Sequence, residues 1–375
     1  MKIQELIEPI IKLLDPFIEL KNLLKVKDNC LVLGDRFIDF KNKQVHLISI
    51  GKSAAPLLAS LQRFFIENQI ETTNVSAIIL DHRNSLSDQF TFWHRHLTGN
   101  HPIPRQKSYQ ATKELIDYLS TIKNDDICFF LISGGTSSLL EIPKESISLQ
   151  EFEKRSHELF EKGLSILELN RERAQLSQVK GGNLLNFCKC ENIYNLIVND
   201  TPQVDDRWVG SGPTFGKRAI SFNWDNREKL KKRLEMAIPD VLWLIEPEVE
   251  NWDELYRLAK NQNEKKVGML GEITLSLPVQ KGQGGRNTHY AAYLLDQKSK
   301  RRVELGSFLS MATDGEDGSS LSAGAYWDDS IGIDPRRLEQ SLQNFDSAKI
   351  FLDSGLLVPN FKSLTNLMDI RIYFI

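Results

Sequence analysis

Residues 127–140, ICFFLISGGTSSLL, decide how the rest of this chain is organised. The first six of them, 127–132, are apolar or cysteine, which is typical of a strand that is buried on both faces of a sheet. The polar run at 133–138, SGGTSS, then ends the strand. A glycine-rich turn in this place exposes several backbone N–H groups at one point, which suits a phosphate or a carboxylate. Taken alone, an ordinary tight connection between a strand and a helix explains the pattern equally well.

The same succession of strand, glycine turn and helix recurs along the chain. Residues 45–50, VHLISI, predict a buried strand that runs into GKS at 51–53 and then a helix. Further strands are predicted over 75–80 and 193–198, and Asp200 follows the second of them. Strands that alternate with helices predict an open parallel sheet, which binds its ligand at the carboxyl ends of the strands.

A charged, helix-prone stretch from about 223 to 265 separates this part of the chain from a second set of strands. A length of 375 residues favours two domains. We therefore predict a two-domain α/β fold: residues 1–245 form a Rossmann-like domain with a parallel sheet, and residues 246–375 form a smaller α/β domain. Strands of the second domain are predicted over 267–270, 273–279 and 303–311.

Composition and charge exclude several classes of function. Hydrophobic residues at 41% and charged residues at 26% are ordinary for a globular protein, and the net charge of −3 gives no basic field for nucleic acid. No apolar run is long enough to span a bilayer. Glu5 and Glu8 interrupt the apolar pattern at the N-terminus, unlike the core of a signal peptide. We expect a cytoplasmic protein without a nucleic-acid or membrane partner.

Two cations lie on glycine turns at predicted strand ends. Lys52 does not belong to a P-loop, because His46 stands where that motif needs a glycine. It still offers a point charge to a phosphate. Arg286 follows the glycine loop at 282–285, which is no dinucleotide fingerprint because Asn287 stands in place of the third glycine. Arginine is suited to bidentate contact with phosphate or carboxylate.

Acidic side chains gather at two of the predicted strand ends. Asp314, Glu316 and Asp317 lie in one glycine-punctuated loop, and Asp200 follows a buried strand. Magnesium prefers one or two carboxylates together with waters and phosphates, so both places are candidate magnesium sites. An acidic surface turn alone explains the pattern as well. The histidines at 94, 96 and 101 lack ligand spacing and are expected to be exposed.

Anion-holding turns, placed cations and acidic loops are together typical of phosphoryl transfer, in which catalysis is mainly positioning and charge neutralisation. Without further knowledge, these residues predict an enzyme that acts on a phosphorylated or carboxylated small molecule.

Seven short motifs make this prediction more specific. They are GKSA at 51–54, HPIP at 101–104, LISGGTSSL at 131–139, LSQVKGG at 176–182, SGPT at 211–214, GGRN at 284–287 and TDGEDG at 313–318. In this order they resemble the motifs of the glycerate 2-kinase family, which has an N-terminal Rossmann-like domain and a C-terminal MOFRL domain. The resemblance implies phosphorylation of the 2-hydroxyl of glycerate to 2-phosphoglycerate, with ATP and Mg²⁺, in a cleft between the two domains.

The resemblance also implies a role for individual residues. The catalytic residues are Lys52, Arg286 and Asp200. The substrate is bound by Ser133, Gly134, Gly135, Thr136, Ser137 and Arg173, and the cofactor by Lys180, Gly212, Thr214, Glu272, Gly284 and Gly285. The metal is held by Asp200, Asp314 and Asp317. Asp200 has a second possible role as the base that takes the hydroxyl proton.

Four departures from the family pattern are present at Arg105, Gln175, Gln203-Val204 and 360–363. They affect acidic and substrate-side features and leave both cations in place, so they predict a shifted substrate or reduced activity. Two alternatives stay open. One is a hydroxypyruvate reductase-type oxidoreductase, which the missing dinucleotide fingerprint opposes, and the other is a non-catalytic, ligand-binding descendant of the kinases.

Overall fold

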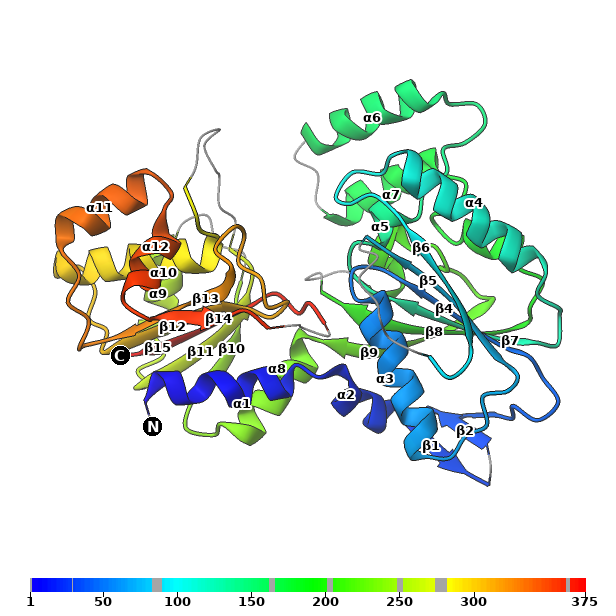
Figure 1. Ribbon diagram of the computed structural model, residues 1–375, viewed down its shortest axis with the longest axis horizontal. Helices are drawn as coiled ribbons and strands as arrows, with labels where there is room; N and C mark the ends of the chain where they lie inside the picture. The colour runs from blue at the N-terminus through cyan, green and yellow to red at the C-terminus, as the bar shows by residue number, and fades with distance from the viewer. Residues whose placement is uncertain are drawn as a thin grey trace. The chain divides into compact units, whose positions relative to one another are not determined.

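The computed structural model describes residues 2–28, 30–82, 90–161, 166–200, 205–247, 252–273, 282–361 and 365–375. The chain divides into two compact units (Figure 1). The continuous unit consists of residues 16–226, and the discontinuous unit combines residues 1–15 with 227–375. This division differs from the predicted boundary at 245/246. Residues 227–245 lie in the discontinuous unit because β10 (Leu242–Ile245) pairs in parallel with β11 (Lys266–Gly271).

The continuous unit is built on a six-stranded sheet in which every pairing is parallel, with the order β6-β5-β4-β7-β8-β9. The order reverses between β4 and β7, which is where an open α/β sheet forms its ligand crevice. The strands predicted at 45–50, 75–80, 127–132 and 193–198 are confirmed. The bounds are β4 (Val45–Ile50), β5 (Val75–Asp81), β6 (Trp93–Thr98), β7 (Ile127–Ile132), β8 (Asn192–Asn199) and β9 (Ala219–Asn226).

Helices bury the apolar side chains of this sheet. In α4 (Gln106–Ser120), Leu115 and Leu119 share one apolar cluster with Ile78 and Phe130 of the strands. Helix α3 (Ala54–Glu67) begins directly after the turn that follows β4 and packs against β4, β5 and β7. The unit also contains α2 (Pro16–Leu23), α5 (Thr136–Leu139), α6 (Leu149–Glu161), α7 (Ile166–Leu176), η2 (Asn183–Phe187) and η3 (Asp206–Ser211), with an antiparallel sheet of β1 (Leu24–Lys27), β2 (Cys30–Leu33) and β3 (Arg36–Ile38).

The discontinuous unit contains a second six-stranded sheet, with the order β10-β11-β15-β12-β13-β14. Helix α10 (Arg286–Ser299) packs on β12 and β13, where Tyr290, Phe308 and Trp327 are fully buried. The strand predicted at 303–311 is confirmed from Ser307, whereas most of the one predicted at 273–279 lies outside the described residues. The remaining elements are η1 (Ile3–Leu6), α1 (Ile7–Leu13), α8 (Arg227–Ala237), α9 (Trp252–Lys260), β12 (Ser307–Ala312), β13 (Ser322–Asp328), α11 (Pro335–Gln343), α12 (Ser347–Asp353), β14 (Leu357–Pro359) and β15 (Asp369–Phe374).

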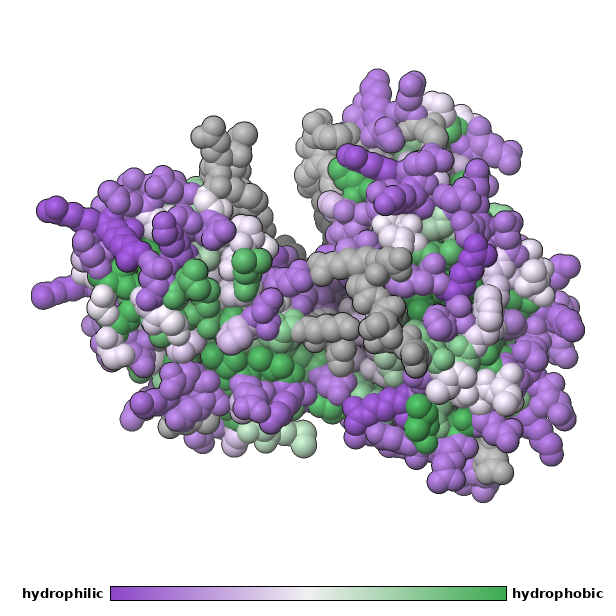
Figure 2. Space-filling view, viewed as in Figure 1, coloured by the Kyte–Doolittle hydropathy of each residue, from purple (hydrophilic) through white to green (hydrophobic). Residues whose placement is uncertain are grey.

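Hydrophilic residues cover most of the visible face of each unit (Figure 2). Within the described part of the chain, no helix combines the length and the apolar character that a membrane crossing needs.

Candidate active site

The turns after β4 and β7 are joined to each other at the switch point of the parallel sheet. The backbone N–H of Lys52 donates to the carbonyl of Gly134 at 2.8 Å. Gly51 has a φ of +132°, and a Cβ at this position would lie 2.1 Å from the Oγ of Ser133. Only glycine fits such a place. The turn that the sequence predicts as an anion cradle is therefore held against the start of α3.

Thr136 and Ser133 fix the shape of this turn. The Oγ1 of Thr136 donates to the carbonyl of Ile50 at 2.9 Å and to that of Ser133 at 2.8 Å. Gly210 packs against the same side chain, since a Cβ there would lie 2.5 Å from the Cβ of Thr136. Thr136 and Ser133 are both buried. Of the predicted substrate-binding turn, Gly134, Gly135 and Ser137 are the members that face a pocket.

This pocket has a volume of about 200 Å³ and opens beside the turn. It brings together residues from five separate segments of the chain, which are the loop before α4, the turn after β7 with α5, helix α7, the end of β8 and η3. Five of its lining residues are predicted site residues, namely Gly134, Gly135, Ser137, Arg173 and Asp200. The others are His101, Pro102, Ser138, Asn170, Val209 and Gly210.

Arg173 forms one polar wall of the pocket, together with Asn170 one helical turn earlier on α7. The Nη1 of Arg173 donates to the Oγ of Ser137 at 3.4 Å, and this Oγ lies 2.9 Å from the Oγ of Ser211. The hydroxyl of Ser211 in turn donates to the Oδ1 of Asn170 at 2.9 Å. Burial lowers the pKa of Arg173, but a guanidinium stays charged at any physiological pH. The wall therefore offers a fixed cation to an anionic ligand.

Asp200 and Lys52 flank the glycine turn. A Cβ on Gly134 would lie 1.9 Å from the Oδ2 of Asp200, so the carboxylate lies directly against the backbone of the turn. A Cβ on Gly135 would lie 2.8 Å from the Cγ of Lys52 and 3.3 Å from the Cδ2 of His101. Lys52 does not line the pocket but packs against one of the glycines that do. The carboxylate of Asp200 thus lies against Gly134, and the aliphatic part of the Lys52 side chain packs against Gly135.

His101 is a pocket residue that the sequence reasoning missed. We expected an exposed histidine, but the ring is partly buried and lines the pocket. Burial, followed by the positive charge of Lys52, lowers the pKa of His101 to about 4. The imidazole is therefore neutral near pH 7 and is able both to donate and to accept a hydrogen bond. The place of His101 in the HPIP motif was the sequence feature that could have identified it. Asn170 is a second pocket residue that was missed, and its spacing of three residues from Arg173 could have identified it.

The lowered pKa of His101 predicts how stability depends on pH. In the unfolded chain this histidine takes up its proton near pH 6.5, but in the folded protein only near pH 4. Since the unfolded state binds more protons between these values, stability falls as the pH falls through this range. We expect His101→Asn to reduce the loss of stability between pH 7 and pH 5, measured by urea unfolding. His94→Asn, at an exposed position, is the control, and an unchanged pH dependence in His101→Asn would contradict the assignment.

Three predicted cofactor-binding residues of the continuous unit lie outside the lining of the pocket. Lys180 is buried and forms an ion pair with Glu141, which is buried as well. The backbone N–H of Gly182 donates to the carbonyl of Gly212 at 2.7 Å, and Thr214 is buried nearby in the chain. These contacts tie the KGG and SGPT motifs to each other. They give the motifs a structural role, and a cofactor contact stays a prediction.

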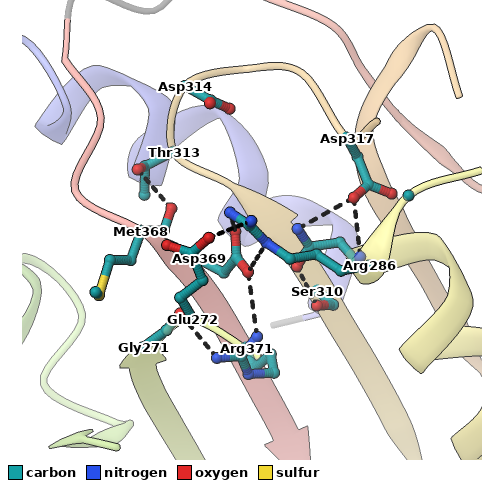
Figure 3. A network of polar contacts seen from close by, with 12 residues as sticks. Gly271, Glu272, Arg286, Ser310, Thr313, Asp314, Asp317, Met368, Asp369 and Arg371 are labelled. Carbon is teal, nitrogen blue, oxygen red and sulfur yellow. Dashed lines mark hydrogen bonds and ion pairs between the residues drawn. The ribbon is translucent and has the colours of Figure 1, made fainter. Parts of the chain in front are cut away.

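The discontinuous unit surrounds Arg286, at the first turn of α10, with carboxylates (Figure 3). Its Nε and Nη2 donate to the two carboxylate oxygens of Asp369 at 2.6 and 3.0 Å. Its Nη1 donates to Glu272. Burial opposes the charge of this guanidinium, but Asp369 and Glu272, with a smaller contribution from Asp314, outweigh burial and raise the pKa of Arg286.

Asp317 is the N-terminal acceptor of α10. Its carboxylate accepts hydrogen bonds from the backbone N–H groups of Asn287 and Thr288 at 2.9 and 2.8 Å. Such a carboxylate stabilises the positive end of a helix. A Cβ on Gly285 would lie 2.3 Å from the Oδ1 of Asp317, and one on Gly284 would lie 2.7 Å from a serine hydroxyl. Both glycines are thus required by packing.

In the ranges that the structure describes, no group of three or more His, Cys, Asp or Glu side chains is arranged to hold a metal ion. Magnesium binding by Asp200, Asp314 and Asp317 therefore stays a prediction. Among the departures from the family pattern, Arg105 and Gln175 are exposed and do not line the pocket. Gln203-Val204 and residues 362–363 lie outside the described residues.

Comparisons with known proteins agree with this architecture. A family model described as a domain of unknown function (DUF4147) matches residues 2–241, and that of the MOFRL family matches residues 267–369. A solved glycerate kinase from Thermotoga maritima superposes with a TM-score of 0.76 at 22% identity, over 99% of this chain and 98% of the other. A protein from Pyrococcus horikoshii gives 0.75 at 22% identity, over 100% and 99%. These structures confirm the predicted two-domain α/β fold.

Several of the curated relatives are named as glycerate kinases, and two are named as putative hydroxypyruvate reductases. A glycerate 2-kinase from Picrophilus torridus is 26% identical, over 99% of this chain and 95% of the relative. A D-glycerate 2-kinase from Thermotoga maritima is 27% identical, over 73% of this chain and 78% of the relative. With its DUF4147 and MOFRL regions in the same order as the predicted domains, the chain belongs to the glycerate 2-kinase family.

Proposed function

We propose that this chain is a kinase that transfers the γ-phosphoryl group of ATP to the 2-hydroxyl of glycerate, or of a closely related small hydroxy acid. The product from glycerate is 2-phosphoglycerate. The observation that carries the proposal is the pocket at the switch point of the parallel sheet, in which a glycine turn, Arg173 and Asp200 meet. Membership of the glycerate 2-kinase family supports the choice of substrate.

Several polar residues in and beside the pocket have a task in the proposed reaction. Arg173 and Ser137 bind the carboxylate of the acid, because a guanidinium and a hydroxyl together match its oxygens. Asp200 accepts the proton of the 2-hydroxyl as the oxygen attacks the γ-phosphorus and ADP leaves. Lys52 neutralises charge on the transferring phosphoryl group. Arg286 stays a proposed catalytic residue, as the family resemblance implies.

Magnesium is compatible with these residues. Mg²⁺ bound to nucleotide needs only one or two protein carboxylates, and Asp200 lines the pocket with its carboxylate against the glycine turn. When bound, the ion would neutralise phosphate charge. A direct metal contact and the base role are alternatives for Asp200, and both need the ionised carboxylate. The Mg²⁺ dependence of Asp200→Asn distinguishes them: loss of a metal ligand raises the Mg²⁺ concentration that gives half-maximal activity, whereas loss of a base lowers kcat at saturating Mg²⁺ and leaves that concentration unchanged.

The test is an assay of the purified chain with ATP and Mg²⁺ against D-glycerate, L-glycerate, lactate and tartronate. We expect ADP to form with glycerate, and phosphorus NMR to identify the 2-phosphate rather than the 3-phosphate. Absence of acid-dependent ADP formation with every acid would overturn the proposal. Tight binding of ATP or acid in the same preparation would then identify a non-catalytic descendant, and oxidation of NADH by hydroxypyruvate would identify a reductase.

Gly134→Ala tests whether this pocket is the site. The added methyl group would lie 1.9 Å from the Oδ2 of Asp200 and would push the carboxylate away from the turn. We expect kcat/KM for glycerate to fall at least about tenfold, since a misplaced reacting group costs orders of magnitude. Gly332→Ala is the matched control, because nothing lies within 4 Å of the methyl group that it adds. Equal activity of both variants would place the reaction elsewhere.

A further inference from the structure

The carboxylates around Arg286 come from two paired strands. Asp369 and Arg371 alternate on β15 and therefore face the same side of the sheet. In the antiparallel register of β11 and β15, Asp369 lies opposite Gly271, the residue before Glu272. The pairing thus places a buried carboxylate and an exposed one beside the same guanidinium (Figure 3).

The inner part of this network is electrically balanced. Arg371 is fully buried, and its Nε and Nη2 donate to the carboxylate of Glu246, at 2.5 Å from the Nε. Its Nη1 lies 3.5 Å from Asp369, which binds Arg286 through both oxygens. Two positive and two negative groups therefore alternate and sum to zero. Breaking such a buried arrangement leaves an uncompensated charge, so Asp369, Arg371 and Glu246 form a fixed support for Arg286.

Glu272 adds one negative charge to this balanced set of four groups. Its side chain is 42% exposed, whereas that of Asp369 is 0% exposed, and both pair with Arg286. An exposed ion pair contributes little free energy because water solvates both partners well. With Glu272 the five groups carry a net charge of −1, and without it the four remaining groups carry none; the carboxylate of Asp314 also acts on Arg286, but less strongly than Glu272. An incoming anion is therefore able to replace Glu272 without disturbing the buried support.

We propose that Glu272 is an exchangeable counterion, which occupies the Nη1 side of Arg286 until a phosphate or carboxylate group of a ligand takes its place. Asp369 meanwhile keeps the guanidinium of Arg286 in its orientation through two hydrogen bonds. The inference rests on the proposed function only for the identity of that ligand. It replaces the predicted direct contact between Glu272 and the cofactor, since a carboxylate repels a phosphate. Glu272 then weakens the binding of neutral ligands, because a neutral ligand cannot replace the ion pair between Glu272 and Arg286.

Calorimetry with inorganic phosphate at low ionic strength tests the exchange, because salt screens exposed charges. We expect Glu272→Gln to bind phosphate about three- to fivefold more tightly than the unsubstituted chain, and Glu272→Asp to bind it like the unsubstituted chain. Glu304→Gln is the matched control: it removes a carboxylate from an exposed ion pair with Lys260 in the same unit, away from Arg286. Its affinity for phosphate is expected to be unchanged.

Phosphate is also able to bind at the pocket of the continuous unit, so the effect must be assigned to Arg286 by a double-mutant cycle. In an Arg286→Ala background, Glu272→Gln is expected to have no effect on phosphate affinity. The same titration with acetate identifies the displacing group. If Glu272→Gln increases the affinity for phosphate alone, the displacing group is a phosphoryl group. If it increases the affinity for acetate equally, the displacing group is the carboxylate of the acid. An unchanged or weaker affinity of Glu272→Gln, or no binding by either protein, would overturn the exchange.

The cycle does not require turnover, so its failure is distinguishable from failure of the proposed function. A chain that shows the coupling but phosphorylates no acid would retain the exchange and lose the kinase assignment. A chain that phosphorylates glycerate without the coupling would retain the kinase and lose the exchange. In an active enzyme, we expect Glu272→Gln to lower KM for the displacing ligand about threefold.

Discussion

Replacing Lys52 with alanine is expected to lower kcat for glycerate phosphorylation by about a hundredfold or more, the size of effect seen when a fixed group that meets developing charge is removed. Lys52 has a backbone that is hydrogen-bonded to the glycine turn and a side chain that packs on Gly135. Its ammonium group is therefore presented by a rigid part of the sheet edge. Steady-state kinetics at saturating ATP and glycerate measure the effect.

Two further variants test whether the loss of kcat is due to the positive charge at position 52. Lys52→Arg keeps the charge and should retain more activity than Lys52→Ala. Lys41→Ala removes the same charge from an exposed position before β4, at the opposite end of that strand, and should leave kcat within twofold. If Lys52→Ala and Lys41→Ala had the same kcat, Lys52 would have no part in catalysis.

Lys180→Met is expected to destabilise the folded chain by about 3–5 kcal/mol, the cost of leaving one partner of a buried ion pair alone. The side chains of Lys180 and Glu141 are 2% and 0% exposed. Burial lowers the pKa of Lys180, and the carboxylate of Glu141 opposes this shift. Without Lys180, the buried carboxylate of Glu141 has lost its ion-pair partner and is not solvated by water. Denaturant unfolding of the two proteins gives the difference in free energy.

The double variant Lys180→Met, Glu141→Leu separates a structural from a ligand-binding role. Replacing a whole buried pair by apolar residues of similar volume is often neutral, so most of the lost stability should return. Activity should return with it if Lys180 only holds the fold. A stable double variant that fails to bind ATP would instead support the cofactor contact implied by the family resemblance.

The interior strands of the continuous unit were predictable because they are buried on both faces and consist of nearly uninterrupted apolar residues. β6 and β9 were not predicted, and both lie at the edges of the sheet. The sequence of β6, WHRHLT, has three exposed residues at its start and no apolar run. β10 is only four residues long and lies in a charged stretch, although Trp243 is buried. Short edge strands depend on pairing with a neighbour, which no local pattern records.

The candidate site was predictable where its residues follow strands. The turn at 133–137 and Asp200 come directly after β7 and β8, and parallel strands bring such turns together. Lys180 was different, because its partner Glu141 lies 39 residues earlier and no spacing rule connects them. The sequence of its loop predicts Asp317 as a metal ligand, but in the structure its carboxylate accepts backbone hydrogen bonds from α10. Residue type identifies a donor or acceptor, and only the fold supplies its partner.

The division of the chain into a continuous and a discontinuous unit has a consequence for biosynthesis. Residues 2–15 leave the ribosome before residues 16–226, yet two of their carbonyls bind later segments: the carbonyl of Leu14 accepts a hydrogen bond from Thr365, and that of Leu13 accepts one from Arg233. Residues 16–226 are able to complete their own unit as they emerge. Residues 2–15 must wait for their partners until residues 227–375 have been translated. The order of folding is therefore not the order of synthesis, and nascent chains that end near residue 226 should expose residues 2–15 to proteases.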